Sequence, residues 1–282
     1  MRPFGGAGSA RGPGVRGHAC CLHGDVADYR RRLADFFAEG VRDGLRVAYI
    51  SSGRAETARA DLADLIDLDR LLAAGAVYVM SARDVYGTGG PVDPERAVAF
   101  VAATTEQALA DGFRGLAVSG DATELISTPA QHDAFTRYEF LADRYMASHP
   151  LSALCGYGLE LGNDTVTELA LLHTPSSSNE TPLQVFGCAD GAIGLAGECD
   201  LGGVAALGRL LPRLRTADAC APAVVDMAGV EYVDHRLLLT LDRYARETGI
   251  AVSLRSAPPF AARLMELLPV SSLQLAESGA QG

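Results

Sequence analysis

Short apolar segments alternate with amphipathic segments along the first half of the chain, and this alternation limits the fold more than any other feature. Apolar residues recur at helical spacing between the apolar segments. The expected strands are residues 45–50, 76–80, 115–119 and 151–157, and the expected helices are residues 25–43, 55–72, 94–110, 131–148 and 165–172. Strands separated by helices pair in parallel through right-handed crossovers. The sequence therefore predicts an α/β fold built on a parallel sheet.

The last third of the chain predicts a second, smaller α/β domain. Two apolar segments flank Asp190-Gly191, a strong hairpin turn pair. Strand and helix patterns then alternate again. The expected strands are residues 183–186, 192–196, 223–227, 250–254 and 272–275, and the expected helices are residues 201–215, 235–247 and 258–268.

A polar segment separates the two regions. Residues 173–182 read HTPSSSNETP, with a proline near each end. Such a segment cannot bury apolar surface and is typical of a tether, which would allow the two domains to reorient. The expected organisation is a flexible leader (1–14), a first domain (15–173), a linker (174–182), a second domain (183–276) and a tail (277–282).

The charged residues exclude several classes of function. The net charge is −11, which does not suit binding to the phosphate backbone of nucleic acids. All 24 basic residues are arginine, so a phosphate-binding loop that needs lysine and Schiff-base chemistry are both excluded. No apolar run is long enough for a membrane span, and the first residues lack the apolar core of a secretion signal. We therefore expect a cytoplasmic protein.

Several short motifs in the first domain carry a family resemblance. They are His18-Ala-Cys20, residues 36–44, residues 111–121, Arg137-Tyr138-Glu139, residues 153–157 and Leu172-His173. Together they resemble the MEDS domain, a sensory module of DcmR-type methanogen and methylotroph regulators, over roughly residues 15–175. The resemblance implies a RecA/KaiC-like sheet without a phosphate loop, consistent with the missing lysine. It also implies the sensing of a small, hydrocarbon-type effector.

Polar side chains at the carboxyl ends of the strands are the first candidates for effector contact, because ligands of open parallel sheets bind there. The segment His18-x-Cys20-Cys21-x-His23 is also the densest set of metal-capable ligands, which the distant Cys155 and His173 could complete. A metal or haem site, a redox-sensing thiol and simple packing of thiols inside a first strand all remain open. The candidate effector-binding residues are His18, Cys20, Ser51, Asp121, Glu139, Cys155, Tyr157 and His173.

The second domain carries its own resemblance. Its motifs are Gly197-Glu-Cys-Asp-Leu201, the run from Val224 to Asp234, and residues 258–268. In this order they resemble a STAS domain, the fold of anti-sigma-factor antagonists. The resemblance implies a module for protein–protein regulation whose partner is a kinase-like anti-sigma factor or another STAS protein.

The phosphorylation site of active antagonists is altered in this chain. In those proteins serine and threonine hydroxyls follow the aspartate that opens a helix, whereas here Asp234 is followed by His235, Arg236 and Leu237. A phosphoryl switch at this position is therefore not expected. His235 could be an ordinary surface residue, a pH-sensitive contact or a phosphoryl acceptor, and the aspartates could simply cap helices. The candidate partner-binding residues at this degenerate phosphosite are Asp200, Asp226, Asp234, His235 and Arg236.

Taken together, these features predict a signalling regulator without catalytic activity or a cofactor. We expect the first domain to sense a small effector and the second to contact a protein partner, as in anti-sigma-factor antagonism and transcription regulation. Two alternatives from this group are a metal, haem or thiol redox sensor and a scaffold that only oligomerises. A third is an ATPase that works without the usual lysine, for which the loss of that charge removes much of the transition-state stabilisation.

Overall fold

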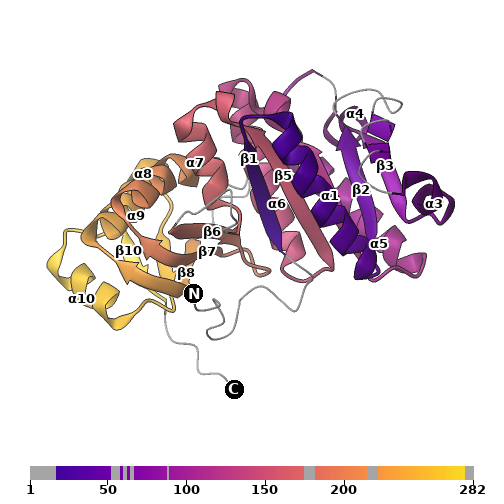
Figure 1. Cartoon of the computed structure of the whole chain (residues 1–282). Helices are drawn as coiled ribbons and strands as arrows, with labels where there is room; N and C mark the ends of the chain where they lie inside the picture. Colours follow the sequence, from indigo (N-terminus) through magenta and orange to yellow (C-terminus); the bar gives the residue numbers. More distant parts are fainter. Residues whose placement is uncertain are drawn as a thin grey trace.

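The computed structural model describes residues 17–51, 58–59, 62–63, 67–87, 89–174, 182–214 and 222–276. Within these residues the chain forms two α/β units, each built around one five-stranded sheet (Figure 1). The expected leader and tail, and residues 175–181 of the expected linker, lie outside the described residues.

The first sheet is fully parallel, as the alternation of strands and helices predicts. Its strand order is β1-β5-β4-β2-β3, so the first strand pairs with the last. The strands are β1 (His18–His23), β2 (Arg46–Ser51), β3 (Val77–Ser81), β4 (Leu116–Asp121) and β5 (Leu151–Gly158).

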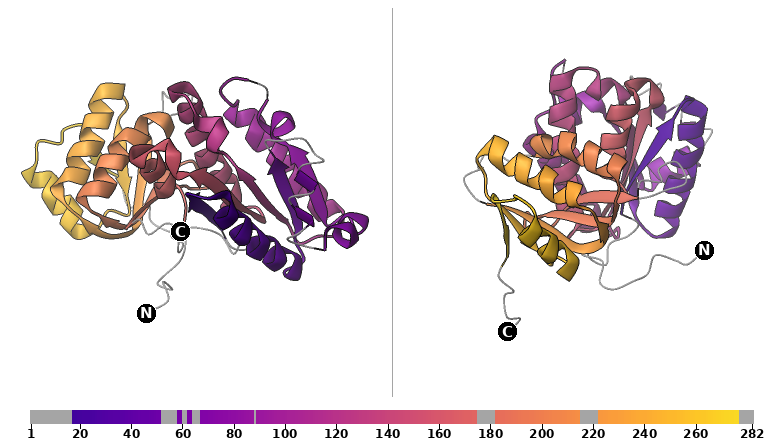
Figure 2. Two further views of the ribbon diagram at one scale, coloured as in Figure 1. Left: turned by 45° about the horizontal axis from the view of Figure 1, so that its top comes forward. Right: turned by 90° about the vertical axis from the view of Figure 1, so that its left-hand side faces the viewer.

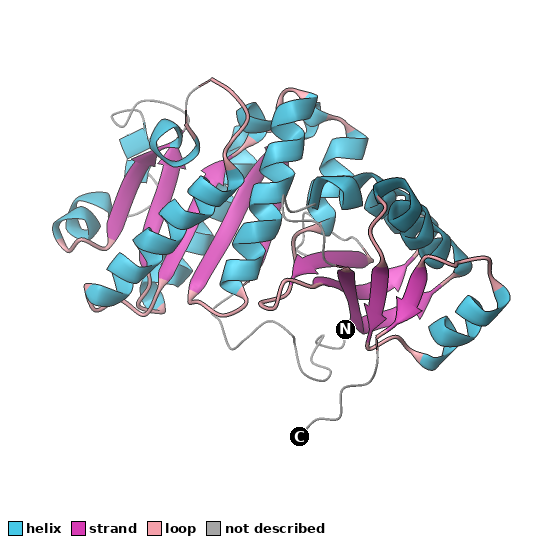
Figure 3. Ribbon diagram, turned by 180° about the vertical axis from the view of Figure 1, so that it is seen from behind, coloured by secondary structure: helices cyan, strands magenta, loops and turns pink. Residues whose placement is uncertain are grey.

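Helices cover both faces of this sheet (Figure 3). The helices are α1 (Val26–Arg42), α3 (Leu68–Ala73), α4 (Ala82–Tyr86), α5 (Pro94–Ala110), α6 (Pro129–Met146) and α7 (Asn163–Leu171), with the short 3-10 turns η1 (Thr123–Ile126) and η2 (Leu159–Leu161). α1 and α3 pack on one face, and α4, α5 and α6 pack on the other. Thr128 and Gln131 form a capping box that starts α6, the helix that later supplies part of the site.

The second sheet is smaller and mixed, with the order β10-β9-β8-β7-β6. β6 and β7 form the predicted hairpin, and the other neighbours are parallel. The elements are β6 (Leu183–Gly187), β7 (Ile193–Cys199), α8 (Leu201–Leu210), η3 (Leu211–Leu214), β8 (Ala223–Val233), α9 (His235–Thr248), β9 (Val252–Arg255), α10 (Pro259–Leu267) and β10 (Leu273–Leu275).

Two elements of the second unit differ most from the expected boundaries. The helix expected over residues 201–215 is α-helical only to Leu210 and continues as η3, because Pro212 lacks the backbone N–H that an α-helix uses. The strand expected to end at Met227 continues to Val233. Irregular register against β7 accompanies this extension, so no simple alternation of buried and exposed residues marks it in the sequence.

The two units share one apolar core. Phe140 of α6 and Leu171 and Leu172 at the end of α7 pack with Leu183 and Leu207 of the second unit. Figure 2 shows the second sheet and its helices lying directly against this end of the first unit. The polar tether therefore joins units that are packed together along α6 and α7 in this structure.

An ionic cluster lies beside the shared core. The buried carboxylate of Glu168 on α7 accepts a hydrogen bond from Nε of Arg209, at 2.6 Å, and lies 3.3 Å from Nη1 of Arg213. Both arginines belong to the second unit.

No helix within the described residues is long and apolar enough to cross a membrane.

Candidate functional site

The alternation of side chains along β1 divides the dense set of metal-capable residues between the two faces of the sheet. His18 and Cys20 face α6. Cys21 packs with Tyr29 of α1 on the opposite face, where the ring of His23 also stacks on Tyr29 with the centroids 5.6 Å apart. The two faces therefore offer separate sets of ligands, and these residues do not form one site.

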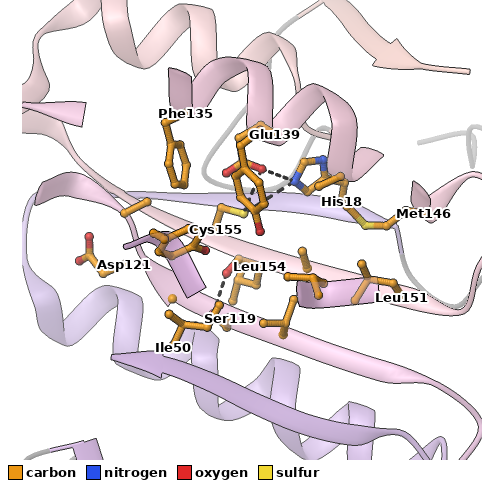
Figure 4. A pocket seen from close by; sticks show the side chains of 18 residues that line it. His18, Ile50, Ser119, Asp121, Phe135, Glu139, Met146, Leu151, Leu154 and Cys155 are labelled. Carbon is orange, nitrogen blue, oxygen red and sulfur yellow. Dashed lines mark hydrogen bonds and ion pairs between the residues drawn. The ribbon is translucent and has the colours of Figure 1, made fainter. Parts of the chain in front are cut away.

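Four side chains meet on the α6 face, and we call them the buried quartet: His18 of β1, Glu139 of α6, Cys155 of β5 and His173, which follows α7. Nε2 of His18 lies 2.8 Å from Oε2 of Glu139, and Sγ of Cys155 lies 3.7 Å from both atoms. Nε2 of His173 lies 3.9 Å from the same carboxylate oxygen. Figure 4 shows His18, Glu139 and Cys155 converging between α6 and the sheet.

The quartet carries charge among buried side chains: His18, Glu139 and His173 are each at most 1% exposed, and Cys155 is partly exposed. Burial acts to lower the pKa of His18, but the carboxylates of Asp143 and Glu139 raise it well above its ordinary value. Burial acts to raise the pKa of Glu139, but the hydrogen bond and charge of His18 hold it below its ordinary value. The two groups therefore form an imidazolium–carboxylate pair at neutral pH, as buried charges require.

His173 is neutral beside this pair. Burial and the charge of His18 lower its pKa to about 4. Its Nδ1 lies 2.7 Å from the carbonyl oxygen of Leu169, which can only accept, so Nδ1 carries the proton and Nε2 carries a lone pair. That Nε2 faces the carboxylate of Glu139 and has no hydrogen-bond partner within the described part of the chain. A buried acceptor without a donor is costly and calls for an explanation.

Two further side chains hold the quartet in place. The hydroxyl of Tyr157 donates a hydrogen bond to Oε1 of Glu139. Oδ1 of Asp143, one turn along α6, lies 3.4 Å from Nδ1 of His18. The other oxygen of Asp143 accepts the backbone N–H of Gly187 in β6, at 2.9 Å. Asp143 therefore connects the quartet to the edge strand of the second unit.

A small cavity adjoins the quartet. His18, Asp121, Tyr138, Glu139 and Cys155 are among its lining residues, and it encloses about 20 Å³. This volume is close to that of one water molecule. Organic ligands usually occupy pockets of about 300–1,000 Å³, so the cavity as it stands suits a water molecule or an ion rather than haem or an organic effector.

The other candidate effector-binding residues lie around the quartet or away from it. Cys20 is in register with Cys155 on the neighbouring strand and is buried. Asp121 lies at the end of β4, where it pairs with His23 at 3.0 Å and accepts hydrogen bonds from Thr123. Ser51 ends β2, which β4 separates from β5, so it is not part of the quartet.

Sequence reasoning did not single out Asp143, although a signal for it was present. Asp143 follows Glu139 by four residues, so the two carboxylates share one face of α6. Both are buried on that face. Two buried acids at helical spacing are unusual and indicate partners of opposite charge or hydrogen-bond donors.

A larger, open groove lies where α6 meets η3. It encloses about 670 Å³ and is lined partly by Asp133, Arg137, Arg209 and Arg213. Each of these arginines already pairs with a carboxylate of the chain. The groove is large enough for an organic molecule, but it offers no free cation to a ligand within the described residues.

The candidate acidic residues of the second domain all have structural roles. Asp200 caps α8 by accepting the N–H of Gly203, at 2.7 Å. Asp234 caps α9 by accepting the N–H of Arg236, whose guanidinium also pairs with it at 2.8 Å. Asp226 accepts two hydrogen bonds from the guanidinium of Arg255. The geometry of these aspartates therefore agrees with the second interpretation, in which they cap helices or pair within the domain.

Exposed apolar side chains gather near the two helix starts, after the paired ends of β7 and β8. Leu201 is 63% exposed and Tyr232 is 54% exposed. His235 is exposed at the first position of α9, and Leu239 follows one turn later. We call these four residues the helix-start surface, and exposed apolar groups of this kind commonly mark contact sites.

Comparison with known proteins identifies both domains. Residues 17–174, more than half of the chain, match the family model described as the methanogen/methylotroph, DcmR sensory domain, or MEDS. Residues 186–275 match the family model described as Mlab, STAS domain. No curated protein matches the chain. The order of the two matches agrees with the two resemblances found in the sequence.

Proposed function

We propose, for a chain that belongs to the MEDS sensory-domain family and continues into a STAS domain, that an effector bound at the buried quartet regulates the protein contacts of the STAS domain. The two domains together suggest a signalling regulator. Beyond that, we propose where the effector binds and how its binding reaches the STAS domain.

One observation carries the proposal, namely the path through Asp143. Its carboxylate contacts His18 of the quartet with one oxygen and the N–H of Gly187 with the other. An occupant that binds Nε2 of His18 changes the charge that faces Asp143, and Asp143 in turn holds β6. Coupling of this kind between two sites is typically about 1–3 kcal/mol.

The output surface in this proposal is the helix-start surface. A STAS domain that lacks hydroxyls after Asp234 cannot be switched by serine phosphorylation at that position. An input from the sensory domain would replace that switch. The partner we propose is a kinase-like anti-sigma factor or another STAS protein, contacted through Leu201, Tyr232 and Leu239.

The geometry favours this input over a thiol redox sensor. Burial and the neighbouring Glu139 raise the pKa of Cys155 well above its ordinary value. The reactive species in thiol oxidation is the thiolate, and redox-sensing cysteines are low in pKa and accessible to solvent. The thiol of Cys155 has a raised pKa and is only partly exposed, so it does not match that description.

Hydrogen exchange tests the proposed coupling. The Glu139→Gln variant of the full chain removes one of the two carboxylates that raise the pKa of His18 and so changes the charge that Asp143 shares between His18 and Gly187. We expect the amide of Gly187 to exchange about fivefold faster or more, which corresponds to the lower end of typical coupling. The matched control is Glu124→Gln, an exposed glutamate on η1. Equal exchange at Gly187 in wild type and Glu139→Gln would contradict the coupling.

A further inference from the structure

We propose that His18, Glu139, Cys155 and His173 form a mononuclear binding site for a divalent transition-metal ion of the zinc class. Each residue offers one ligand atom, and the four atoms lie within 4.8 Å of one another. The set consists of one sulfur, two imidazole nitrogens and one carboxylate oxygen. Zn²⁺ takes four ligands of these kinds in tetrahedral geometry.

The spacing of the four atoms is close to what such an ion needs. With bonds of about 2.0–2.3 Å, tetrahedral ligands lie about 3.3–3.6 Å apart. Sγ of Cys155 already lies 3.7 Å from the His18 and Glu139 atoms, and Nε2 of His173 lies 3.9 Å from Oε2 of Glu139. The 2.8 Å pair of His18 and Glu139 has to open by about half an ångström, and the longer separations, which are at most 4.8 Å, have to close.

The lone pair of His173 is the observation that points to a ligand. Its Nε2 is fully buried, has no hydrogen-bond partner among the described residues and faces a carboxylate oxygen that also carries lone pairs. Two acceptors facing each other repel. A cation between them converts this repulsion into two coordinate bonds.

The contacts outside the quartet are those that metal ligands commonly have. Histidines that bind metals usually give their other ring nitrogen to a carboxylate or a backbone carbonyl. His18 turns Nδ1 toward Asp143, and His173 donates from Nδ1 to the carbonyl of Leu169. Glu139 keeps its second oxygen on the hydroxyl of Tyr157. The ligand orientations are therefore fixed before any ion enters.

The charges also balance when an ion binds. Zn²⁺ replaces the proton on Nε2 of His18 and the thiol proton of Cys155, and both protons leave to solvent. The resulting thiolate and the carboxylate of Glu139 together neutralise the two charges of the ion. A neutral cluster is the form that a water-free interior accepts at least cost.

Cobalt titration of the full chain tests the site. After treatment with a chelator, we expect Co²⁺ to bind with one equivalent per chain and to give the intense visible bands of tetrahedral cobalt together with a thiolate charge-transfer band. Added Zn²⁺ should displace it. Failure of the folded wild-type chain to bind one equivalent would overturn the site.

Matched variants assign the ligands. Cys155→Ser should lose the thiolate band, whereas Cys21→Ser, a buried cysteine on the opposite face of β1, should keep it. His173→Ala should weaken binding by about 100-fold or more, whereas His235→Ala should leave it unchanged. Circular dichroism checks that each variant is folded. A thiolate band that survives in folded Cys155→Ser would place the ion elsewhere.

Only the regulatory meaning of the site rests on the proposed function, and the two can fail separately. If the ion binds but the exchange of Gly187 is the same with and without it, the metal site stands and metal-driven coupling is wrong. If no ion binds and Glu139→Gln still speeds the exchange of Gly187, the coupling stands and the metal site is wrong.

Discussion

At the scale of single residues, the surroundings of each carboxylate determine what it does. Glu139 is buried and stays ionised because His18 pairs with it. Asp143 divides its two oxygens between two domains. Asp190 and Asp226 both pair with Arg255 beside the turn of the β6–β7 hairpin. Carboxylates of this chain therefore have three different roles: one belongs to the candidate site, one connects the two domains, and two hold a turn.

The pairing of Asp190 predicts a pH-dependent contribution to stability. The hydrogen bond from Arg255 holds the pKa of Asp190 below its ordinary value, which is about 3.9 in an unfolded chain. Such a group stabilises the fold above about pH 4, and this contribution is lost as the pH falls through the lowered pKa. Because the side chain of Asp190 is 54% exposed, we expect only about 0.5 kcal/mol at neutral pH.

Thermal unfolding of Asp190→Asn at pH 7 and pH 3 measures this contribution. Asn-Gly is as good a hairpin turn as Asp-Gly, so the variant removes the charge and keeps the turn. The variant should melt below the wild type at pH 7, and the two should converge at pH 3. A difference that is the same at both pH values would mean that the ion pair is not its source.

At the scale of helices and strands, the elements with a regular pattern of apolar residues could be predicted. Where that pattern is interrupted, the boundaries of the elements could not. β2, β4 and β5 of the first sheet follow the predicted segments because their residues are almost all buried, and the hairpin follows its turn pair. β8 is longer than predicted. The sequence did not indicate its extension, because residues 228–232 are not buried and its register against β7 is irregular. The packing of α6 against β6 left no sequence pattern, since it depends on contacts between distant segments.

Gly187 is the residue that allows α6 and β6 to approach. A Cβ added there would lie 2.7 Å from the carbonyl oxygen of Phe140 and 3.0 Å from the backbone nitrogen of Arg144. Backbone atoms of a helix cannot move without breaking its hydrogen bonds. Gly187→Ala should therefore lower the free energy of unfolding by about 1–3 kcal/mol, which urea unfolding measures. Gly90→Ala is the control, because nothing lies within 4 Å of its added Cβ, and its effect should stay within about 0.5 kcal/mol. Equal stability of the two variants would mean that the interface adjusts freely.

At the scale of the whole molecule, the sequence pointed to all four residues of the quartet but not to their arrangement. His18, Glu139, Cys155 and His173 were all candidates, because their residue types and motifs marked them. Their convergence depends on β1 pairing with β5 and on the helix before His173 returning to the same face. Ser51 was a candidate only through its strand end, and the strand order places it two positions away from β5.

The helix-start surface makes a prediction for the protein as a whole. Tyr232→Ala should weaken binding of the full chain to its protein partner by about tenfold or more, as loss of a large aromatic contact does. Leu267→Ala is the matched control, because Leu267 is an exposed leucine on α10 of the same domain. Calorimetry against a panel of kinase-like anti-sigma factors and STAS proteins measures both. A similar loss from both variants would assign the contact to another face.

The quartet joins the beginning and the end of one domain. His18 opens β1, and His173 adjoins Thr174, whose amide and hydroxyl both bond to the carbonyl oxygen of His18. During synthesis on the ribosome, His18 therefore meets its last partner only after His173 has emerged. The quartet can therefore form only when the whole first domain has been synthesised, just before the STAS domain follows.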